Sequence, residues 1–115
     1  MPLGAHRPYP PPMDGDAHTV TVPLPTYSTD GGMTLAWVDG YRLRVRVLGS
    51  MEQGFEVVIE GNAEGFESLG RYALALAQTD VPSGFHLHME DSTVLDAPSS
   101  SLVLDREDDL SEYDV

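Results

Sequence analysis

The segment from residue 55 to residue 91 has the pattern of a strand, a helix and a second strand, and this order limits the possible folds more than any other feature of the sequence. Apolar residues recur at every second position from 55 to 59 and again from 85 to 89, which is typical of strands with one buried face. Between them, Asn62 stands where a helix N-cap is expected, and Pro82 ends the helical pattern because proline cannot continue a helix. A helix packed across a sheet buries all three apolar faces, so the sequence predicts an α+β fold.

The expected helix covers about residues 63–78 and has one apolar stripe. The members of this stripe recur at helical spacing and are Phe66, Leu69, Ala73, Leu76 and Ala77. Gly70 lies on the same stripe, where the lack of a side chain would let the helix approach the sheet closely. We therefore expect this face of the helix to be buried.

Further strands are predicted on both sides of this unit, at residues 19–22, 33–38, 41–48 and 101–105. Asp39-Gly40 separates the middle two and is a strong signal for a two-residue hairpin turn with positive φ at both positions. Matching the apolar faces of neighbouring strands sets Val47 opposite Phe55. The prediction is a mostly antiparallel sheet of five or six strands, with the one helix packed on one face.

The length of 115 residues suits a single folded domain. Five of the nine prolines lie in residues 1–18, so we expect a proline-rich tail there, one α+β domain over residues 19–105 and an acidic tail over residues 106–115. No apolar run approaches the roughly 20 residues that cross a bilayer, and the first residues have no hydrophobic signal segment. We expect a soluble, cytoplasmic protein without a membrane partner.

The chain has a formal net charge of −13, and the excess of acids lies in its second half. Residues 1–50 contain four aspartates and four arginines, so residues 51–115 carry the whole excess. Such a surface repels nucleic acid and anionic membranes and attracts a basic partner, although solubility alone would also explain it. The chain contains no cysteine, which excludes disulfides and cysteine nucleophiles.

Acidic and histidine side chains gather near the start of the expected helix and on the adjoining strand ends, and we predict that they bind a partner protein. These residues are Glu60, Glu64, Glu67, His86, His88, Glu90 and Asp91. Complementary charge speeds the encounter of two proteins, and aromatic anchors such as Trp37 and Tyr41 would supply affinity. The alternative is an ordinary solvated surface.

His86, His88 and Glu90 alternate along one expected strand, so their side chains point the same way. Two histidines and a carboxylate can bind zinc or iron(II) and leave a position open for water. A small metal-binding protein or metal-dependent enzyme is therefore the alternative function, although the wet face of a half-buried strand explains the same residues. No Gly-x-Ser-x-Gly turn is present, and nothing else in the sequence predicts an enzyme or a cofactor.

Three stretches carry a family resemblance: residues 58–77, residues 81–88 with their His-x-His pair, and the leucine-rich ending at 95–104. Together, over about residues 55–105, the chain resembles the immunity protein 32 family. Members of that family look like antidotes in bacterial polymorphic toxin systems, encoded beside the toxin that they neutralise. The resemblance implies an α+β protein that binds a toxin and is not an enzyme. A nuclease toxin would fit the acidic charge, because its groove must be basic to hold nucleic acid. The identity of the toxin and the oligomeric state stay open.

Overall fold

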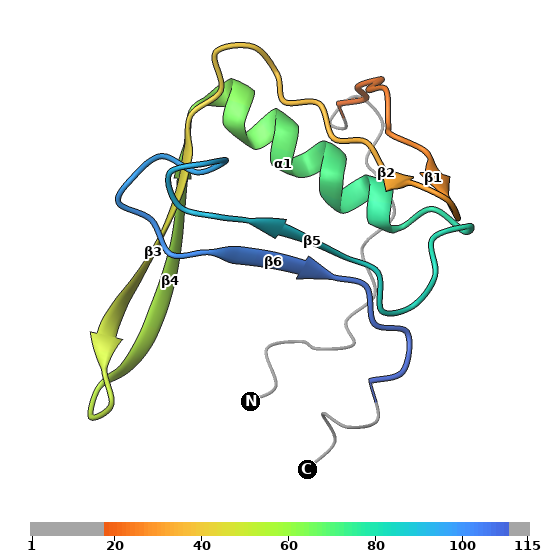
Figure 1. Cartoon of the computed structure of the whole chain (residues 1–115). Helices are drawn as coiled ribbons and strands as arrows, with labels where there is room; N and C mark the ends of the chain where they lie inside the picture. The colour runs from red at the N-terminus through yellow and green to blue at the C-terminus, as the bar shows by residue number, and fades with distance from the viewer. Residues whose placement is uncertain (1–17, 111–115) are drawn as a thin grey trace.

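The computed structural model describes residues 18–110, in which one helix and six strands form an α+β fold (Figure 1). The strands pair antiparallel in three separate two-stranded sheets. The elements are β1 (Tyr27–Ser28), β2 (Gly32–Met33), β3 (Leu43–Ser50), β4 (Gly54–Gly61), α1 (Ala63–Leu76), β5 (His86–Met89) and β6 (Leu102–Asp105). Most of the expected proline-rich tail and the end of the expected acidic tail lie outside the described residues.

The α+β class is confirmed, but the prediction of one sheet with five or six strands is wrong. β5 and β6 do not join β3 and β4, because an irregular segment occupies the edge of β3 where a further strand would pair. The backbone nitrogens of Asp96 and Ser100 donate to the carbonyl oxygens of Leu43 and Val45, both at 2.8 Å. The expected strand at residues 19–22 is also absent, since that segment has no strand structure.

The turn at Asp39-Gly40 forms, but the predicted hairpin around it does not. The nitrogen of Tyr41 donates to the carbonyl oxygen of Val38 at 3.1 Å, and Gly40 has a positive φ of 80°, whereas Asp39 lacks the positive φ that was predicted for it. Of the expected strand at residues 33–38, only Met33 lies in a strand. Val38, at the end of the expected strand, bonds to the helix instead, since its nitrogen donates to the hydroxyl of Ser68 at 2.9 Å.

β3 and β4 form a hairpin that extends beyond the other elements as an arm (Figure 1). Its register differs by two residues from the predicted one, so that Val47 lies opposite Val57 and not opposite Phe55. The connection is shorter than expected, because Ser50 already pairs with Gly54, which has a positive φ of 85°. A shift by two residues keeps every side chain on its predicted face of the hairpin.

The helix α1 begins as predicted, with the side chain of Asn62 accepting a hydrogen bond from the nitrogen of Gly65, and it ends at Leu76. Its buried face is not the predicted stripe. The buried residues are Gly65, Ser68, Tyr72, Ala75 and Leu76, whereas Phe66 is 47% exposed. Gly70 has open space around it, and Gly65 is the glycine at which the helix touches its neighbours.

The core lies between α1, the β5–β6 pair and the base of the arm (Figure 1). Its buried members are Leu43, Val45, Tyr72, Leu76, Val81, Leu87, Met89 and Leu95. Trp37 stacks on Tyr41 with ring centroids 4.5 Å apart and meets the edge of Tyr72 at 4.8 Å. These two expected surface anchors are therefore half-buried and packed against the core.

Candidate partner-binding surface

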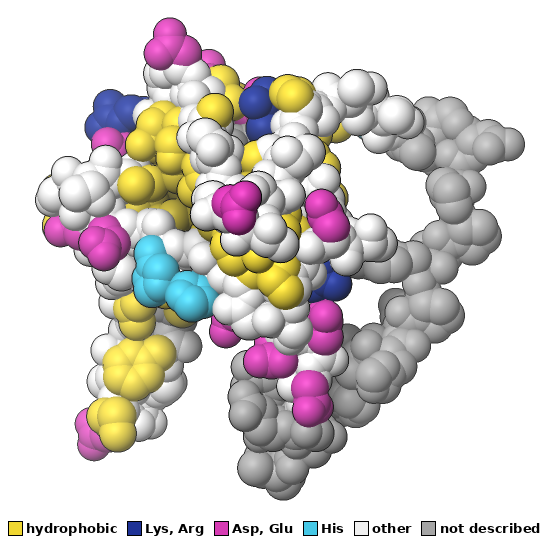
Figure 2. Space-filling model, turned by 45° about the vertical axis from the view of Figure 1, so that its right-hand side comes forward, with side chains coloured by type: hydrophobic (Ala, Val, Ile, Leu, Met, Phe, Trp, Pro, Cys, Tyr) yellow, Lys and Arg dark blue, Asp and Glu magenta, His cyan; other side chains and the backbone are white. Residues whose placement is uncertain are grey.

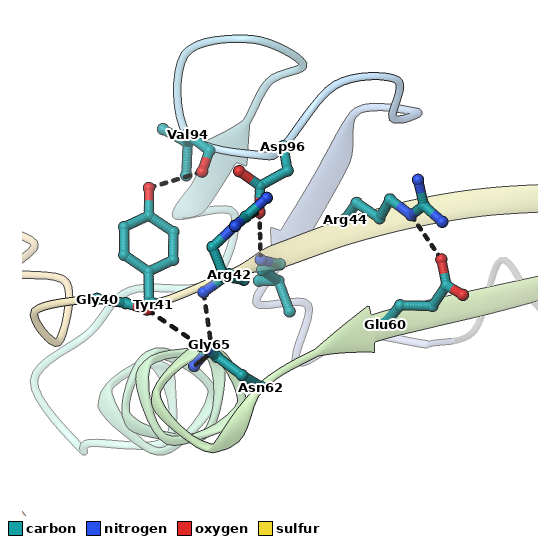
Figure 3. A network of polar contacts seen from close by, with 10 residues as sticks. Gly40, Tyr41, Arg42, Arg44, Glu60, Asn62, Gly65, Val94 and Asp96 are labelled. Carbon is teal, nitrogen blue, oxygen red and sulfur yellow. Dashed lines mark hydrogen bonds and ion pairs between the residues drawn. The ribbon is translucent and has the colours of Figure 1, made fainter.

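The start of α1 is fastened to the segment before β3 by one side chain (Figure 3). The side-chain oxygen of Asn62 accepts from the nitrogens of both Gly65, at 2.8 Å, and Arg42, at 2.9 Å. Its side-chain nitrogen donates to the carbonyl oxygen of Gly40 at 3.0 Å. These contacts fix the direction in which the first turn of α1, with Glu64, faces solvent.

The loop after β5 is fastened to the same segment from another side (Figure 3). The hydroxyl of Tyr41 donates to the carbonyl oxygen of Val94 at 2.7 Å. The carboxylate of Asp96 accepts from the Nε of Arg42 at 2.9 Å and from the nitrogen of Leu43 at 3.0 Å. The segment at residues 40–43 thus positions both the helix start and the loop that carries Glu90 and Asp91.

Two of the acids predicted to bind a partner are already paired with arginines of this chain. Glu60 lies 2.6 Å from the Nε of Arg44 and 3.1 Å from the Nε of Arg46, and the hydrogen bond from Arg44 lowers the pKa of Glu60 below its ordinary value. Glu67 pairs with Arg71 one helical turn further along α1. Their negative charge is largely compensated before any partner arrives.

The other three acids of the predicted set keep their charge free. Within residues 18–110, Glu64, Glu90 and Asp91 form no ion pair, and Glu90 and Asp91 are exposed. The carbonyl oxygen of Glu90 accepts from the nitrogens of Val94 and Leu95, at 3.1 and 3.0 Å, which fixes the turn while its carboxylate faces solvent. These three carboxylates are the part of the set best suited to attract a basic surface.

His86 and His88 lie side by side on the exposed face of β5, with ring centroids 4.8 Å apart. The Nδ1 of His86 is 3.0 Å from the carbonyl oxygen of Gly84. No group of three or more His, Asp or Glu side chains in the described part of the chain could hold a metal ion. Glu90 therefore does not complete the three-ligand arrangement that the alternating spacing suggested.

The sequence reasoning missed one surface, which is the apolar face of the arm. Val47, Phe55, Val57 and Ile59 were expected to be buried but are 49%, 60%, 61% and 36% exposed. Figure 2 shows hydrophobic side chains along the projecting arm, with the histidines on the same side of the molecule. An apolar patch on the surface of a soluble protein often marks an interaction site. Strand periodicity identifies the apolar face, but it carries no information on what covers it.

The family model described as immunity protein 32 matches residues 56–107, which confirms the resemblance in the sequence. The match runs from β4 to β6 and includes every residue predicted to bind a partner. Comparisons with curated proteins and with solved structures give no match. Among the described residues, no helix is long and apolar enough to cross a membrane.

Proposed function

We propose that this protein is a non-enzymatic immunity protein, which binds and neutralises a cognate bacterial toxin in the cytoplasm. The observation that carries the proposal is the match of residues 56–107 to the immunity protein 32 family. The matched segment supplies α1, β5 and the intervening loops, on which Glu90, Asp91 and the histidine pair are exposed and Glu64 is half-buried. An antidote acts by binding, and it needs no catalytic group of its own.

The proposed contact surface consists of Glu60, Glu64, Glu67, His86, His88, Glu90 and Asp91. Glu64, Glu90 and Asp91 supply the attraction, because they form no ion pair within residues 18–110. Glu60 and Glu67 pair with arginines of this chain, so they contribute to the shape of the contact surface and not to the attraction. The net charge of −13 favours a basic toxin, such as a nuclease whose groove binds phosphates, and disfavours nucleic acid or an anionic membrane as the partner.

The test is the rate of association with the toxin encoded beside the gene, together with protection of cells that express that toxin. Replacing Glu64, Glu90 and Asp91 by Gln, Gln and Asn removes three free charges with little change of shape. We expect association to slow by about tenfold or more at low salt, since electrostatic steering is worth 10- to 1,000-fold.

The matched control is Asp30→Asn with Glu52→Gln and Asp80→Asn, which removes three exposed acids from elsewhere on the chain. The net charge is then the same in both triple variants, so only the position of the lost charges differs. Equal association rates for the two variants would show that the surface is wrongly placed. If every variant keeps both binding and protection, and the toxin itself is acidic, electrostatic docking would be contradicted altogether.

A further inference from the structure

The exposed apolar residues of the arm coincide with a free edge of its sheet. In an antiparallel pair, opposite residues either exchange two backbone hydrogen bonds or point their N–H and C=O groups away from each other. Leu43 and Val45 direct these groups away from β4, since they bond to residues 96–100 instead. Ile59 lies opposite Val45, so its backbone groups point away from β3 as well.

By the same alternation, the backbone N–H and C=O groups of Val57 and Phe55 also point outward from β4. Within residues 18–110, no hydrogen bond occupies these outward groups. The side chains of the same three residues form the exposed apolar face, at 60% for Phe55, 61% for Val57 and 36% for Ile59. This edge has no proline or lysine, and its charged side chains, Glu56 and Glu60, alternate with the apolar residues and so lie on the other face of β4.

We infer that two copies of this chain pair through β4, which lies antiparallel to β4 of the second copy and extends the two arms into one four-stranded sheet. A two-fold axis through Val57 would set this residue opposite Val57 of the second copy, and Phe55 opposite Ile59 of the second copy. All of these residues have outward backbone groups, so each opposed pair exchanges two hydrogen bonds. Their apolar side chains meet on one face of the joined sheet.

Charge and backbone geometry select this register among its neighbours. A shift that centres the axis on Val58 sets Glu56 against Glu60 of the second copy twice, and opposed like charges destabilise a sheet. Moving one β4 strand by a single residue along the other sets residues whose backbone groups point outward against residues that already bond to β3, and no ladder forms. In the register centred on Val57, Glu56 lies opposite Val58 and Glu60 lies opposite Gly54, so no acid opposes another.

A second copy is the occupant that the observations favour, because the edge is complementary to itself. In an isologous contact, a two-fold rotation brings a patch onto the same patch of the second copy, so its apolar side chains and its free backbone groups must each meet their like. The β4 edge meets this requirement. The arm also projects from the rest of the chain, so a second arm can reach the edge (Figure 1). A strand supplied by a toxin would use the same edge by strand addition and is a distinct outcome of the test.

The first experiment measures the molar mass of the full chain over a dilution series by light scattering and sedimentation velocity. We expect twice the chain mass of 12.5 kDa, with dissociation on dilution. Val57→Lys sets two ammonium groups together at the axis and should give a monomer. Leu48→Lys is the control, because Leu48 is also exposed, at 40%, but lies on β3 and on the opposite face of the arm.

A crosslink tests the register without relying on a destabilising change. The chain has no cysteine, so Val57→Cys introduces one thiol per copy. Hydrogen-bonded antiparallel pairs have Cα atoms about 5.5 Å apart, within the range that a disulfide spans. Mild oxidation should join the Val57→Cys chains covalently, whereas Val58→Cys, one position along, should crosslink several-fold less.

A chain that stays monomeric at every concentration would overturn the inference, as would a dimer that Val57→Lys leaves intact. A monomer in which Val57→Lys abolishes toxin binding would also overturn it and would assign the β4 edge to a strand of the toxin. These readouts do not depend on the acidic surface. The inference can therefore fail while the proposed immunity function holds, and the reverse is equally possible.

Discussion

The side-chain oxygen of Asn62 lies 2.9 Å from the backbone nitrogen of Arg42 and joins the start of α1 to the beginning of the arm. The same oxygen caps the helix by accepting from Gly65. Asn62→Ala removes the oxygen that accepts both hydrogen bonds and the nitrogen that donates to Gly40, so we expect a loss of about 2 kcal/mol in the free energy of unfolding, the upper end for a cap. Urea unfolding followed by circular dichroism measures this loss.

Asn62→Asp is the matched control, because it keeps the acceptor oxygen for Gly65 and Arg42 but replaces the nitrogen that donates to Gly40 by a second oxygen. A carboxylate also interacts favourably with the positive end of the helix. The aspartate variant should therefore retain most of the stability that the alanine variant loses. Equal losses in the two variants would show that the contact with Gly40, and not the shared oxygen, holds these elements together.

Gly65 and Gly70 occupy the same helix but have opposite surroundings. A Cβ atom at Gly65 would lie 2.0 Å from the carbonyl oxygen of Arg42, whereas one at Gly70 would meet nothing within 4 Å. Gly65→Ala should cost about 3 kcal/mol, the upper end for overpacking, because backbone must move. Gly70→Ala should stabilise by about 0.5–1 kcal/mol, because alanine restricts the unfolded chain and favours a helix. Thermal unfolding distinguishes the two, and a neutral Gly65→Ala would refute the close approach.

The start of α1 and the apolar faces of β3 and β4 are local features that were predicted correctly. Asn62 caps α1 through backbone chemistry that acts within a few residues, and the apolar faces of β3 and β4 follow from strand alternation. The helix nevertheless ends at Leu76, before the expected residue 78 and well before Pro82. The buried face of α1 was predicted wrongly because Ser68 looks like a surface residue. Its hydroxyl is satisfied inside the protein, donating to the carbonyl oxygen of Glu64 and accepting from Val38.

The candidate surface was harder to predict because its charges depend on contacts between distant residues. Arg42 bonds to Asp96, 54 positions along the chain, and Glu60 pairs with Arg44. The predicted register, with Val47 opposite Phe55, would set Arg42 opposite Glu60, whereas in the observed register Arg44 lies opposite Glu60. Which acids keep a free charge therefore follows from the tertiary structure, whereas the excess of acids is visible in the sequence.

Two tyrosines near the core predict opposite effects of removing a hydroxyl. Tyr72 is 1% exposed, and its hydroxyl has no hydrogen-bond partner among the described residues. Tyr41 donates to the carbonyl oxygen of Val94 at 2.7 Å. Tyr72→Phe should be neutral or slightly stabilising, whereas Tyr41→Phe should cost about 1 kcal/mol. Guanidinium unfolding of both variants measures the difference, and a large loss in Tyr72→Phe would reveal a polar contact of that hydroxyl.

The buried hydroxyl of Tyr72 also predicts how the stability of the protein changes at alkaline pH. Burial, aided by the nearby Tyr41, raises the pKa of Tyr72 from 10.0 to about 12. The folded state thus favours the neutral phenol. The contribution of Tyr72 to the stability of the fold is complete below pH 10.0 and is lost as the pH rises through about 12. Tyr72→Phe should lose less stability over this range than the unchanged chain. Identical alkaline unfolding curves would contradict the burial of an ionisable hydroxyl.

Arg44 and Glu60 predict a dependence on pH at the acidic end. The hydrogen bond from Arg44 lowers the pKa of Glu60 from its ordinary 4.5, so the carboxylate is favoured in the folded state. Its contribution to stability is present above pH 4.5 and is lost as the pH falls through the lower folded pKa. Arg44→Gln should raise the titration midpoint of Glu60, measured by carbon-detected NMR of its carboxyl group.

Arg71→Gln is the control for that titration, because Arg71 pairs with Glu67 on α1 and not with Glu60. It should leave the midpoint of Glu60 unchanged. The pair is partly exposed, so added salt should reduce the difference between the unchanged chain and Arg44→Gln. A midpoint that Arg44→Gln does not move would show that Arg46, at 3.1 Å, holds the carboxylate in its charged form without the shorter contact.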